Sequence, residues 1–513
     1  MTAPSRRFLS VWLRRLSTDR IERRASLPGD APLIVIEPVK SALRVAAMND
    51  AAARLGLQTG MPLADVRAMH PGIGVCNADV AADRALLEAV ADWCDRYTPL
   101  VGLDAPDGLL LDISGCAHLF GGESALMQDM AARLFRQGLN ARIAVADTAG
   151  CAWAVARYGN PLLVAKGETL AALNDLPLAA LRIDDESVIA LAQAGLKRIS
   201  DVTERPRAPL AARFGSGLLR RLDQALGREE ESITPLLPIP SCTAERRFAD
   251  PIGLEADVLG TIERLARELS IAMERRGEGA RLLQAALFRT DGKVYRFDAK
   301  AGEPLRDPAR IRRLFSERFT AIGDECDPGF GYDMIRLSAL TVERLDPVQA
   351  GLARDDHRVE LAHLVDRLSA RFGAARVTRL SPRDTHIPEF AEQAVPAQMV
   401  QENPIVQPVE QDSLAPARPI RLFARPEAVE ALAEVPDGPP VRFKWRCITH
   451  DVVAVEGPER IAMQWWRDDA GRVLTRDYFR VESRQGIRAW LYRDGLYGSE
   501  TRNPKWFLHG LFA

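Results

Sequence analysis

The sequence predicts a multidomain α+β protein whose chain ends in an extra β-rich domain. Three observations support this fold class. Apolar runs of strand length alternate with helical patterns up to about residue 165, a helical pattern follows, and strand-like aromatic residues concentrate after residue 419. A chain of 513 residues is long enough for about three or four domains.

The composition fits a globular protein and argues against several other classes. Hydrophobic residues make up 47% of the chain and charged residues 27%. The net charge is -2, so any nucleic-acid surface must come from local clustering of the 68 Lys and Arg residues. The seven cysteines form no CxxC pair, which predicts free thiols in a reducing compartment. Neither a signal peptide nor a membrane span is indicated, so we expect a cytoplasmic location.

The first domain is expected to alternate strands and helices. Residues 49–69 have the pattern of a helix, a Gly-bearing turn and a second helix. The remaining expected elements are strands at 8–13, 33–36, 108–113 and 141–146 and helices at 86–93 and 126–135.

After a short, Leu- and Ala-rich helical region at 166–235, the pattern changes. Residues 281–288 and 293–297 alternate as strands around Asp291-Gly292, which is typical of a hairpin. Helical stripes occur at Ile262, Leu265, Ala266, Leu269 and Met273, and again at Leu361, Leu364, Val365, Leu368 and Phe372. We therefore expect these two helices to pack on one antiparallel sheet.

The last part of the chain divides into a linker and a β-rich domain. Residues 383–418 are rich in Pro, Gln, Glu and Ala, which predicts a flexible linker. Residues 419–513 carry aromatics at strand spacing: Phe443, Trp445, Trp465, Trp466, Tyr478, Phe479, Trp490 and Tyr492. Such aromatics more often form a core, although they could also stack on single-stranded bases or dock a protein.

Several stretches, in order, resemble the Y-family translesion DNA polymerases. They are residues 8–13, 52–62, 97–114, 141–156 and 191–202. The resemblance implies a palm at 1–165 with fingers inserted at about 37–82, a helical thumb at 166–238 with a helix-hairpin-helix, and a little-finger-like α/β domain at 239–382. The β-rich domain at 419–513 lies beyond this resemblance.

The residues that carry the chemistry of that family are replaced here. Its polymerases hold two magnesium ions with an Asp of the first palm strand and an adjacent Asp-Glu pair. This chain has Trp12 at the first position and Asp107-Gly108 at the pair. We therefore expect no metal, no cofactor and no polymerase activity. The alternative is a slow translesion polymerase that uses Asp107 with Asp104 or Asp112.

The nucleotide pocket implied by the resemblance also departs from the pattern. Asp50 and Ala53 stand where the family's fingers have a triphosphate-contacting Tyr and Arg. Trp153 stands where the later palm helix has a phosphate-contacting Lys. An Asp repels a triphosphate and an indole supplies no positive charge, so both changes favour a protein that does not transfer nucleotides.

Within the Y family, the chain resembles the ImuB family of polymerase-like mutasome subunits. The stretches that carry this resemblance are residues 327–333 with 335–338, residues 381–389, and residues 476–482 with 490–495. It implies a non-catalytic subunit that binds damaged or primer-template DNA in SOS mutagenesis and translesion synthesis. It also implies three partners: the DNA sliding clamp, a RecA-like accessory protein and an error-prone C-family DNA polymerase, with docking assigned to 419–513. A plain DNA-binding regulator without these partners is a third hypothesis.

Several candidate binding residues follow from these resemblances. In the thumb hairpin, Gly195 would form the turn beside Lys197 and Arg198. In the little finger, a DNA-facing row would contain Arg275, Arg276, Arg281, Arg289, Lys293 and Arg296, unless these form an ordinary solvated face. The family's clamp-binding peptide is represented only by Gln349 and Leu352. A second candidate, residues 420–423, reads more simply as the first strand of the C-terminal domain.

Overall fold

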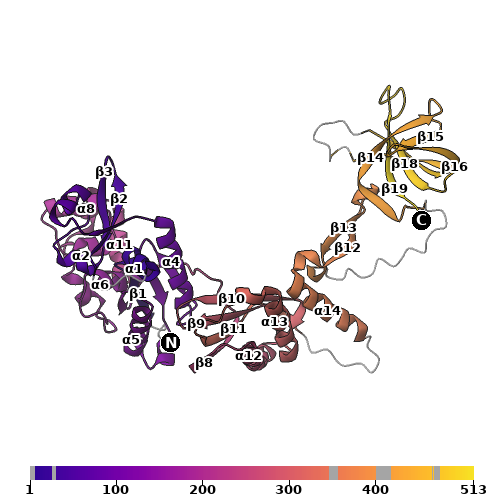
Figure 1. Ribbon diagram of the computed structural model, residues 1–513. Coiled ribbons are helices and arrows are strands. Elements are labelled where there is room, and N and C mark those ends of the chain that lie inside the picture. Colours follow the sequence, from indigo (N-terminus) through magenta and orange to yellow (C-terminus); the bar gives the residue numbers. More distant parts are fainter. Residues whose placement is uncertain (1–5, 26–30, 346–355, 400–416, 465, 467–473) are drawn as a thin grey trace. The chain divides into compact units, whose positions relative to one another are not determined.

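The computed structural model describes residues 6–25, 31–345, 356–399, 417–464, 466 and 474–513. The chain divides into two compact units, Met1–Arg354 and Asp355–Ala513. Figure 1 shows the elements of each unit. No helix in the described part of the chain is long and apolar enough to cross a membrane.

The palm is built on a four-stranded antiparallel sheet in the order β5-β6-β1-β7. Helices α4 and α5 pack on one face of this sheet, and α6 packs on the other. Both faces are buried, so strands such as FLSVW and GLLLD are nearly continuous apolar runs. The elements are β1 (Phe8–Trp12), α1 (Leu16–Ala25), α4 (Val80–Cys94), β5 (Val101–Asp104), β6 (Gly108–Asp112), η1 (Ala117–Phe120), α5 (Glu123–Arg136), β7 (Arg142–Ala146) and α6 (Ala149–Tyr158).

The fingers form a small sheet in the order β3-β2-β4, with two short helices around a separate apolar core. Their elements are β2 (Leu33–Val39), β3 (Ala42–Met48), α2 (Asp50–Arg54), α3 (Leu63–Met69) and β4 (Gly74–Asn77). The thumb is helical and shares its core with α6. It contains α7 (Thr169–Asn174), η2 (Leu178–Leu181), α8 (Asp185–Gln193), α9 (Ile199–Thr203), α10 (Arg207–Phe214) and α11 (Ser216–Leu226).

The little finger is a four-stranded antiparallel sheet, β10-β9-β11-β8, with two helices. Its strands are β8 (Cys242–Ile252), β9 (Glu278–Arg289), β10 (Val294–Leu305) and β11 (Tyr332–Arg344), and its helices are α12 (Glu255–Arg276), α13 (Pro308–Ile322) and the short η3 (Gly323–Glu325). The predicted hairpin around Asp291-Gly292 is confirmed, with Gly292 at φ +92°.

One helix prediction for this sheet is wrong. The second helix that packs with α12 and β10 is α13, whose buried residues are Ile311, Leu314, Phe315 and Phe319. The predicted stripe at 361–372 instead belongs to α14 (Asp356–Phe372) in the second unit. There Leu361, Leu364 and Phe372 are about half exposed while Asp366 is buried, so periodicity alone chose the wrong burial partner.

The second unit ends in a closed barrel of six strands, which confirms the predicted β-rich domain. The strands are β14 (Arg421–Ala433), β15 (Pro440–Trp445), β16 (Ile448–Ile461), β17 (Arg476–Ser483), β18 (Arg488–Asp494) and β19 (Lys505–Leu511). Barrel closure pairs β14 with β19 and leaves no free sheet edge between them.

The predicted linker at 383–418 requires a correction over its described part. Ordered elements occupy much of 374–399: η4 (Ala374–Arg376), β12 (Thr378–Pro382), η5 (Pro388–Phe390), β13 (Glu392–Pro396) and η6 (Ala397–Met399). Strands β12 and β13 form a hairpin, and Ile387 between them is buried. The low hydrophobic content of this stretch predicted a linker, whereas polar contacts hold the segment in an ordered conformation. Residues 400–416 lie outside the described residues.

Candidate functional site

The palm sheet brings the predicted degenerate positions together. Strands β1 and β6 are antiparallel neighbours, and their register places Trp12 opposite Gly108. Asp107 lies in the turn between β5 and β6, where its carbonyl oxygen accepts a hydrogen bond from the Leu13 amide at 2.8 Å. The fold therefore gathers these three residues at one end of the sheet, as the polymerase resemblance implies.

Both carboxylates at this end of the sheet already have partners. Asp107 accepts hydrogen bonds from the Trp12 indole at 2.8 Å and from Arg157 Nη2 at 3.1 Å. Asp104 accepts from the Trp153 indole at 2.6 Å and from the same Arg157 nitrogen at 3.1 Å. A single guanidinium therefore bridges the two carboxylates.

Arg157 is the central cation of this cluster. Its guanidinium carbon lies 4.0 Å from the ring centroid of Trp153 and 5.5 Å from that of Trp12. Its side chain is only 9% exposed. Burial lowers the pKa of Arg157, and the charges of Asp104 and Asp107 oppose this effect. The sequence analysis missed Arg157, although its position one turn after Trp153 on α6 places both on the same helix face.

Gly108 leaves the space that this arrangement needs. A Cβ atom at residue 108 would lie 2.7 Å from the Asp104 carboxylate and 2.9 Å from Nη2 of Arg157. A glutamate, as in the active polymerases, therefore does not fit while Arg157 bridges Asp104 and Asp107. The loss of the acid at 108 and the presence of the arginine are parts of one arrangement.

The donor set does not fit a two-metal polymerase centre. Hard cations require several oxygen ligands, whereas here Asp104 and Asp107 are occupied by indole and guanidinium donors. Asp112 accepts a hydrogen bond from the Ser114 amide at 2.9 Å, which makes it a local turn residue. Within the described residues, no group of three His, Cys, Asp or Glu side chains is arranged to hold a metal ion. We derive no catalytic step through a metal.

A cavity of about 520 Å³ opens beside these residues. Arg182 and Arg221 on its wall both pair with Glu231, at 2.5 and 3.3 Å. The cavity is lined by Trp12, Asp104, Ala105, Pro106, Asp107, Trp153, Arg157, Tyr158, Arg182 and Arg221. Its charges are thus largely paired within the protein.

In the fingers, Asp50 forms ion pairs with Arg14, at 2.8 Å, and with Arg15. Its negative charge is therefore compensated from the segment that follows β1. Ala53 is exposed and offers no polar group. The side chains of Asp50 and Ala53 offer no donor to a triphosphate, and the indole N–H of Trp153 is already bonded to Asp104.

The thumb hairpin is formed as predicted, but its amides are not free. Gly195 adopts φ +80° between α8 and α9. The backbone N–H groups of Lys197 and Arg198 donate to the Asp201 carboxylate at 2.8 and 2.9 Å. The Arg198 guanidinium also pairs with Asp175 at 2.8 Å. A phosphate would therefore have to be contacted through the exposed side chains rather than through these amides.

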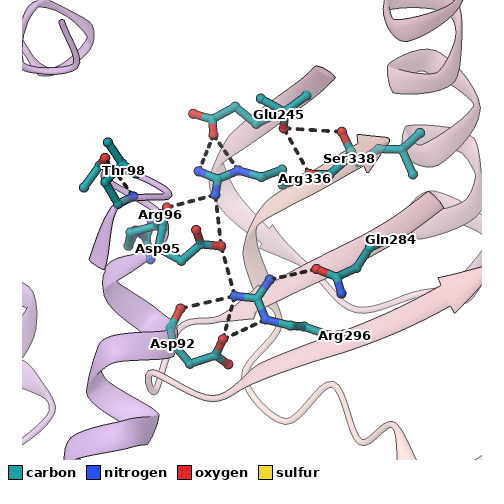
Figure 2. Close-up of polar contacts among 12 residues, drawn as sticks. Asp92, Asp95, Arg96, Thr98, Glu245, Gln284, Arg296, Arg336 and Ser338 are labelled. Atoms are coloured by element: carbon teal, nitrogen blue, oxygen red, sulfur yellow. Dashed lines mark hydrogen bonds and ion pairs between the residues drawn. The ribbon is translucent and has the colours of Figure 1, made fainter. Parts of the chain in front are cut away.

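The six basic residues expected to form one row in the little finger separate into different surroundings. Arg289 pairs with Asp291, and Lys293 lies 4.4 Å from the Tyr295 ring. Arg276 donates to the Ser241 carbonyl, Arg281 lies near Glu343, and Arg275 is exposed at the end of α12. Arg296 points to the palm, where it pairs with Asp92 and Asp95 (Figure 2).

Of the two candidate clamp-binding peptides, the structure describes only the second. Gln349 and Leu352 lie outside the described residues. In the second candidate, Leu422 and Phe423 pack against the barrel cores from β14, as expected for the first strand of that domain.

The barrel aromatics are mainly core residues. Phe443, Tyr478, Phe479, Trp490, Tyr492 and Trp506 are buried. Stacking of bases on these rings is therefore ruled out in this conformation. Trp466 is 62% exposed.

Two of the family-like stretches meet in the second unit, which the sequence analysis did not foresee. Glu389 accepts an ion-paired hydrogen bond from Arg476 at 2.7 Å, and Arg476 also donates to the Tyr478 hydroxyl at 3.3 Å. His386 contacts the Ala462 carbonyl oxygen at 2.6 Å. The segment around residues 383–390 is thus fixed to the barrel wall.

Comparisons with known proteins agree with this architecture. Residues 17–157 match the model of the impB/mucB/samB family, and residues 239–355 match that of the impB/mucB/samB family C-terminal domain. Protein ImuB of Caulobacter vibrioides is 41% identical over 471 residues, which cover 90% of this chain and 100% of the relative. DNA polymerase IV of the same species is 22% identical, with 63% of this chain and 81% of the relative covered.

Among solved structures, the post-insertion binary complex of Dbh DNA polymerase matches with a TM-score of 0.40 and 15% identity, covering 67% of this chain and 100% of that chain. The palm, fingers, thumb and little finger define a Y-family polymerase-like protein with an added C-terminal β-barrel. Within that class, the chain belongs to the ImuB family. This membership implies a role in DNA damage tolerance.

Proposed function

We propose that this protein is a non-catalytic, DNA-binding and protein-bridging subunit of a damage-induced, error-prone translesion synthesis complex. One observation carries the non-catalytic part: Arg157 bridges Asp104 and Asp107 in the place where metal-binding carboxylates would be needed. A buried cation at this point repels a second cation and occupies the oxygens that would bind it.

The alternative is a slow polymerase that uses Asp107 with Asp104 or Asp112. Asp104 and Asp107 share one guanidinium, and Asp112 is bonded to the Ser114 amide. A metal ion would have to displace Arg157 from its position on the Trp153 ring. The contacts therefore favour the adaptor.

Primer extension by the purified full chain, with Mg²⁺ and with Mn²⁺, tests this proposal. We expect no incorporation of a single nucleotide on a primer-template. Asp107→Ala is the control variant, because extension that this substitution abolishes would establish the polymerase alternative. Binding to the same primer-template should be measurable and should weaken as salt rises.

DNA contact is assigned to the glycine turn of the thumb hairpin and to basic side chains of the thumb and the little finger. The candidates are Gly195, Lys197, Arg198, Arg275, Arg276, Arg289 and Lys293. Because the thumb amides are bonded to Asp201, Lys197→Ala should act through its side chain. We expect it to lower affinity for all sequences alike and to reduce the salt dependence by about one phosphate contact.

The bridging role requires partners. The proposed partners are the sliding clamp, a RecA-like accessory protein and a C-family polymerase. We propose that the protein binds them at the nucleoid after DNA damage. Gln349 and Leu352 are assigned to the clamp, and residues 419–513 to the other partners. Pull-down with each purified partner tests this assignment, with Gln349→Ala/Leu352→Ala as the clamp variant. Retention of DNA binding without any partner would favour the plain DNA-binding regulator.

A further inference from the structure

The little-finger sheet meets the palm through a set of charged side chains, here called the palm–sheet cluster. On the palm side they come from α4, from the turn after it and from α5; on the other side they come from β8, β10 and β11. The members are Asp92, Asp95, Arg96, Arg133, Glu245, Arg296, Asp333 and Arg336. Figure 2 shows Asp92 and Asp95 at the end of α4 directed at Arg296 and Arg336 of the sheet.

Two sheet arginines bind the palm carboxylates closely. Arg296 Nη2 lies 2.6 Å from Asp92 Oδ1 and 2.9 Å from Asp95 Oδ2. Arg336 Nη1 lies 3.1 Å from Asp95 Oδ2 and donates to the Asp95 carbonyl oxygen at 2.8 Å. Arg296 Nη2 also donates to the Asp92 carbonyl oxygen at 3.4 Å, so the palm presents four oxygen acceptors to the two guanidinium groups.

The rest of the cluster completes the charge pairing. Arg96 donates to both carboxylate oxygens of Asp333, at 3.1 and 3.4 Å, and Arg133 lies 2.5 Å from the same carboxylate. Arg336 also pairs with Glu245 of its own sheet at 2.8 Å. The eight members carry four positive and four negative charges, so docking leaves no net charge uncompensated.

The contact is buried but mainly ionic. Asp95 and Arg336 are 6% and 8% exposed. The buried apolar residues on this side of the sheet are Ala286, Phe288 and Met334, and the guanidiniums of Arg96, Arg296 and Arg336 lie 5.6–6.0 Å from the Phe288 ring. Contacts between domains separate readily unless they are large and hydrophobic. The palm can therefore separate from the sheet when another anion takes the place of its carboxylates on the sheet arginines.

We propose that Asp92 and Asp95 occupy Arg296 and Arg336 as backbone phosphates would, so that the palm and a nucleic-acid backbone compete for this face of the little-finger sheet. Guanidinium groups bind carboxylate and phosphate oxygens with the same forked geometry. Helices α12 and α13 pack on the sheet, and the palm holds the side that carries Arg296 and Arg336. The docked palm is therefore an autoinhibitory cover, and this inference rests on the proposed DNA binding.

Charge-neutral variants of the palm acids test the competition. Asp92→Asn and Asp95→Asn each remove one negative charge with little change in size. Glu88→Gln is the matched control, because it removes one negative charge from the same helix but Glu88 is 43% exposed and pairs with Arg84. Affinity of the full chain for a fluorescent 20-base-pair duplex is measured across a salt series.

If the cover competes with DNA, opening it raises the fraction of binding-competent protein and hence the apparent affinity. We expect Asp92→Asn and Asp95→Asn to bind about tenfold more tightly than the parent, and Glu88→Gln to differ from it by less than about twofold. Equal effects of all three variants would overturn the proposal, since they would reflect only the change in net charge.

Hydrogen–deuterium exchange of the unaltered protein gives a second test that does not depend on variants that fold. Added duplex should increase exchange in the amides of residues 92–98, because the palm is released, while it slows exchange in β10 and β11. Protection of both regions, or no change in residues 92–98 when DNA binds, would refute the competition. Absence of any DNA binding by the parent protein would instead refute the proposed function, and this inference with it.

Discussion

The indole nitrogen of Trp12 donates a hydrogen bond to Oδ2 of Asp107 across 2.8 Å. An aromatic donor thus occupies the one carboxylate that remains at the three positions where Y-family polymerases carry acids. Arg157 donates to the other oxygen of Asp107. The site has therefore not only lost two acidic residues but has also gained a cation and an indole that pair with the acid that remains.

The first prediction concerns the space beside Gly108. In Gly108→Ala the new Cβ would lie 2.7 Å from the Asp104 carboxylate and 3.0 Å from the Asp104 carbonyl oxygen. Crowding of this kind costs about 1–3 kcal/mol. Hydrogen exchange of the β1 and β6 amides should report this loss of stability.

Gly260→Ala is the matched control, because nothing lies within 4 Å of the added methyl group on α12. An alanine inside a helix should stabilise it by about 0.5–1 kcal/mol. If Gly108→Ala were as stable as the parent, the proposed link between Gly108 and Arg157 would be wrong.

Much of the palm could be predicted because its strands are buried on both faces and therefore form dense apolar runs. Trp12 and Gly108 were assigned through the resemblance, and the register of the two strands places them opposite each other. Arg157 could not be assigned in the same way, since its two acidic partners are about 50 residues away in the chain. Contacts such as Arg296 with Asp92, which are separated by 204 residues, leave no periodic signal.

The prediction of the second helix on the little-finger sheet was wrong because two amphipathic helices follow in the sequence and the wrong one was chosen. The stripe of α14 satisfied the helical spacing, yet α13 covers the sheet through Ile311, Leu314 and Phe315. Spacing predicts that a helix has an apolar face, but it carries no information about what covers that face. The polar segment around Glu389 was missed for the converse reason, because ion pairs hold it in place.

The second prediction tests Arg157 as the central cation. Arg157→Met keeps an apolar chain against Trp153 but leaves Asp104 and Asp107 without their shared counterion. Removing one partner of a largely buried ion pair is strongly destabilising, and we expect a loss of about 2–4 kcal/mol. Urea unfolding followed by tryptophan fluorescence measures it.

Arg84→Met serves as the comparison, since Arg84 is 74% exposed and pairs with Glu88 one helical turn away. Its loss should cost less than about 0.5 kcal/mol. Equal stability of the Arg157 and Arg84 variants would contradict the central role of Arg157.

The third prediction concerns the segment fixed to the barrel by Glu389. In Glu389→Gln the Arg476 guanidinium, which is 16% exposed, loses its charged partner. We expect the contact between the segment and the barrel to lose about 1–2 kcal/mol. Tryptic cleavage after Arg383 should then be roughly tenfold faster, because its rate follows the population of the open segment. Glu392→Gln, an exposed acid on β13, should leave the cleavage rate unchanged; faster cleavage in both variants would argue against a specific role of Glu389.

The last prediction is a pH dependence centred on His509. Its side chain is buried, its Nδ1 lies 2.8 Å from the Tyr478 hydroxyl, and burial lowers the pKa of His509 from 6.5 to about 4. Because the folded pKa lies below the unfolded one, the unfolded chain takes up a proton first as pH falls. The barrel therefore has its full stability above pH 6.5 and loses stability between pH 6.5 and about 4, by at most about 3 kcal/mol.

Hydrogen exchange of the β17 and β19 amides across this range measures the loss. His509→Gln keeps a hydrogen-bonding group for Tyr478 but cannot titrate, so the difference in stability between it and the parent should shrink steadily as pH falls. His118→Gln, at an exposed histidine of the palm, should leave the barrel profile unchanged. A parent and a His509→Gln profile that run parallel from pH 7 to pH 4 would show that protonation of His509 does not destabilise the barrel.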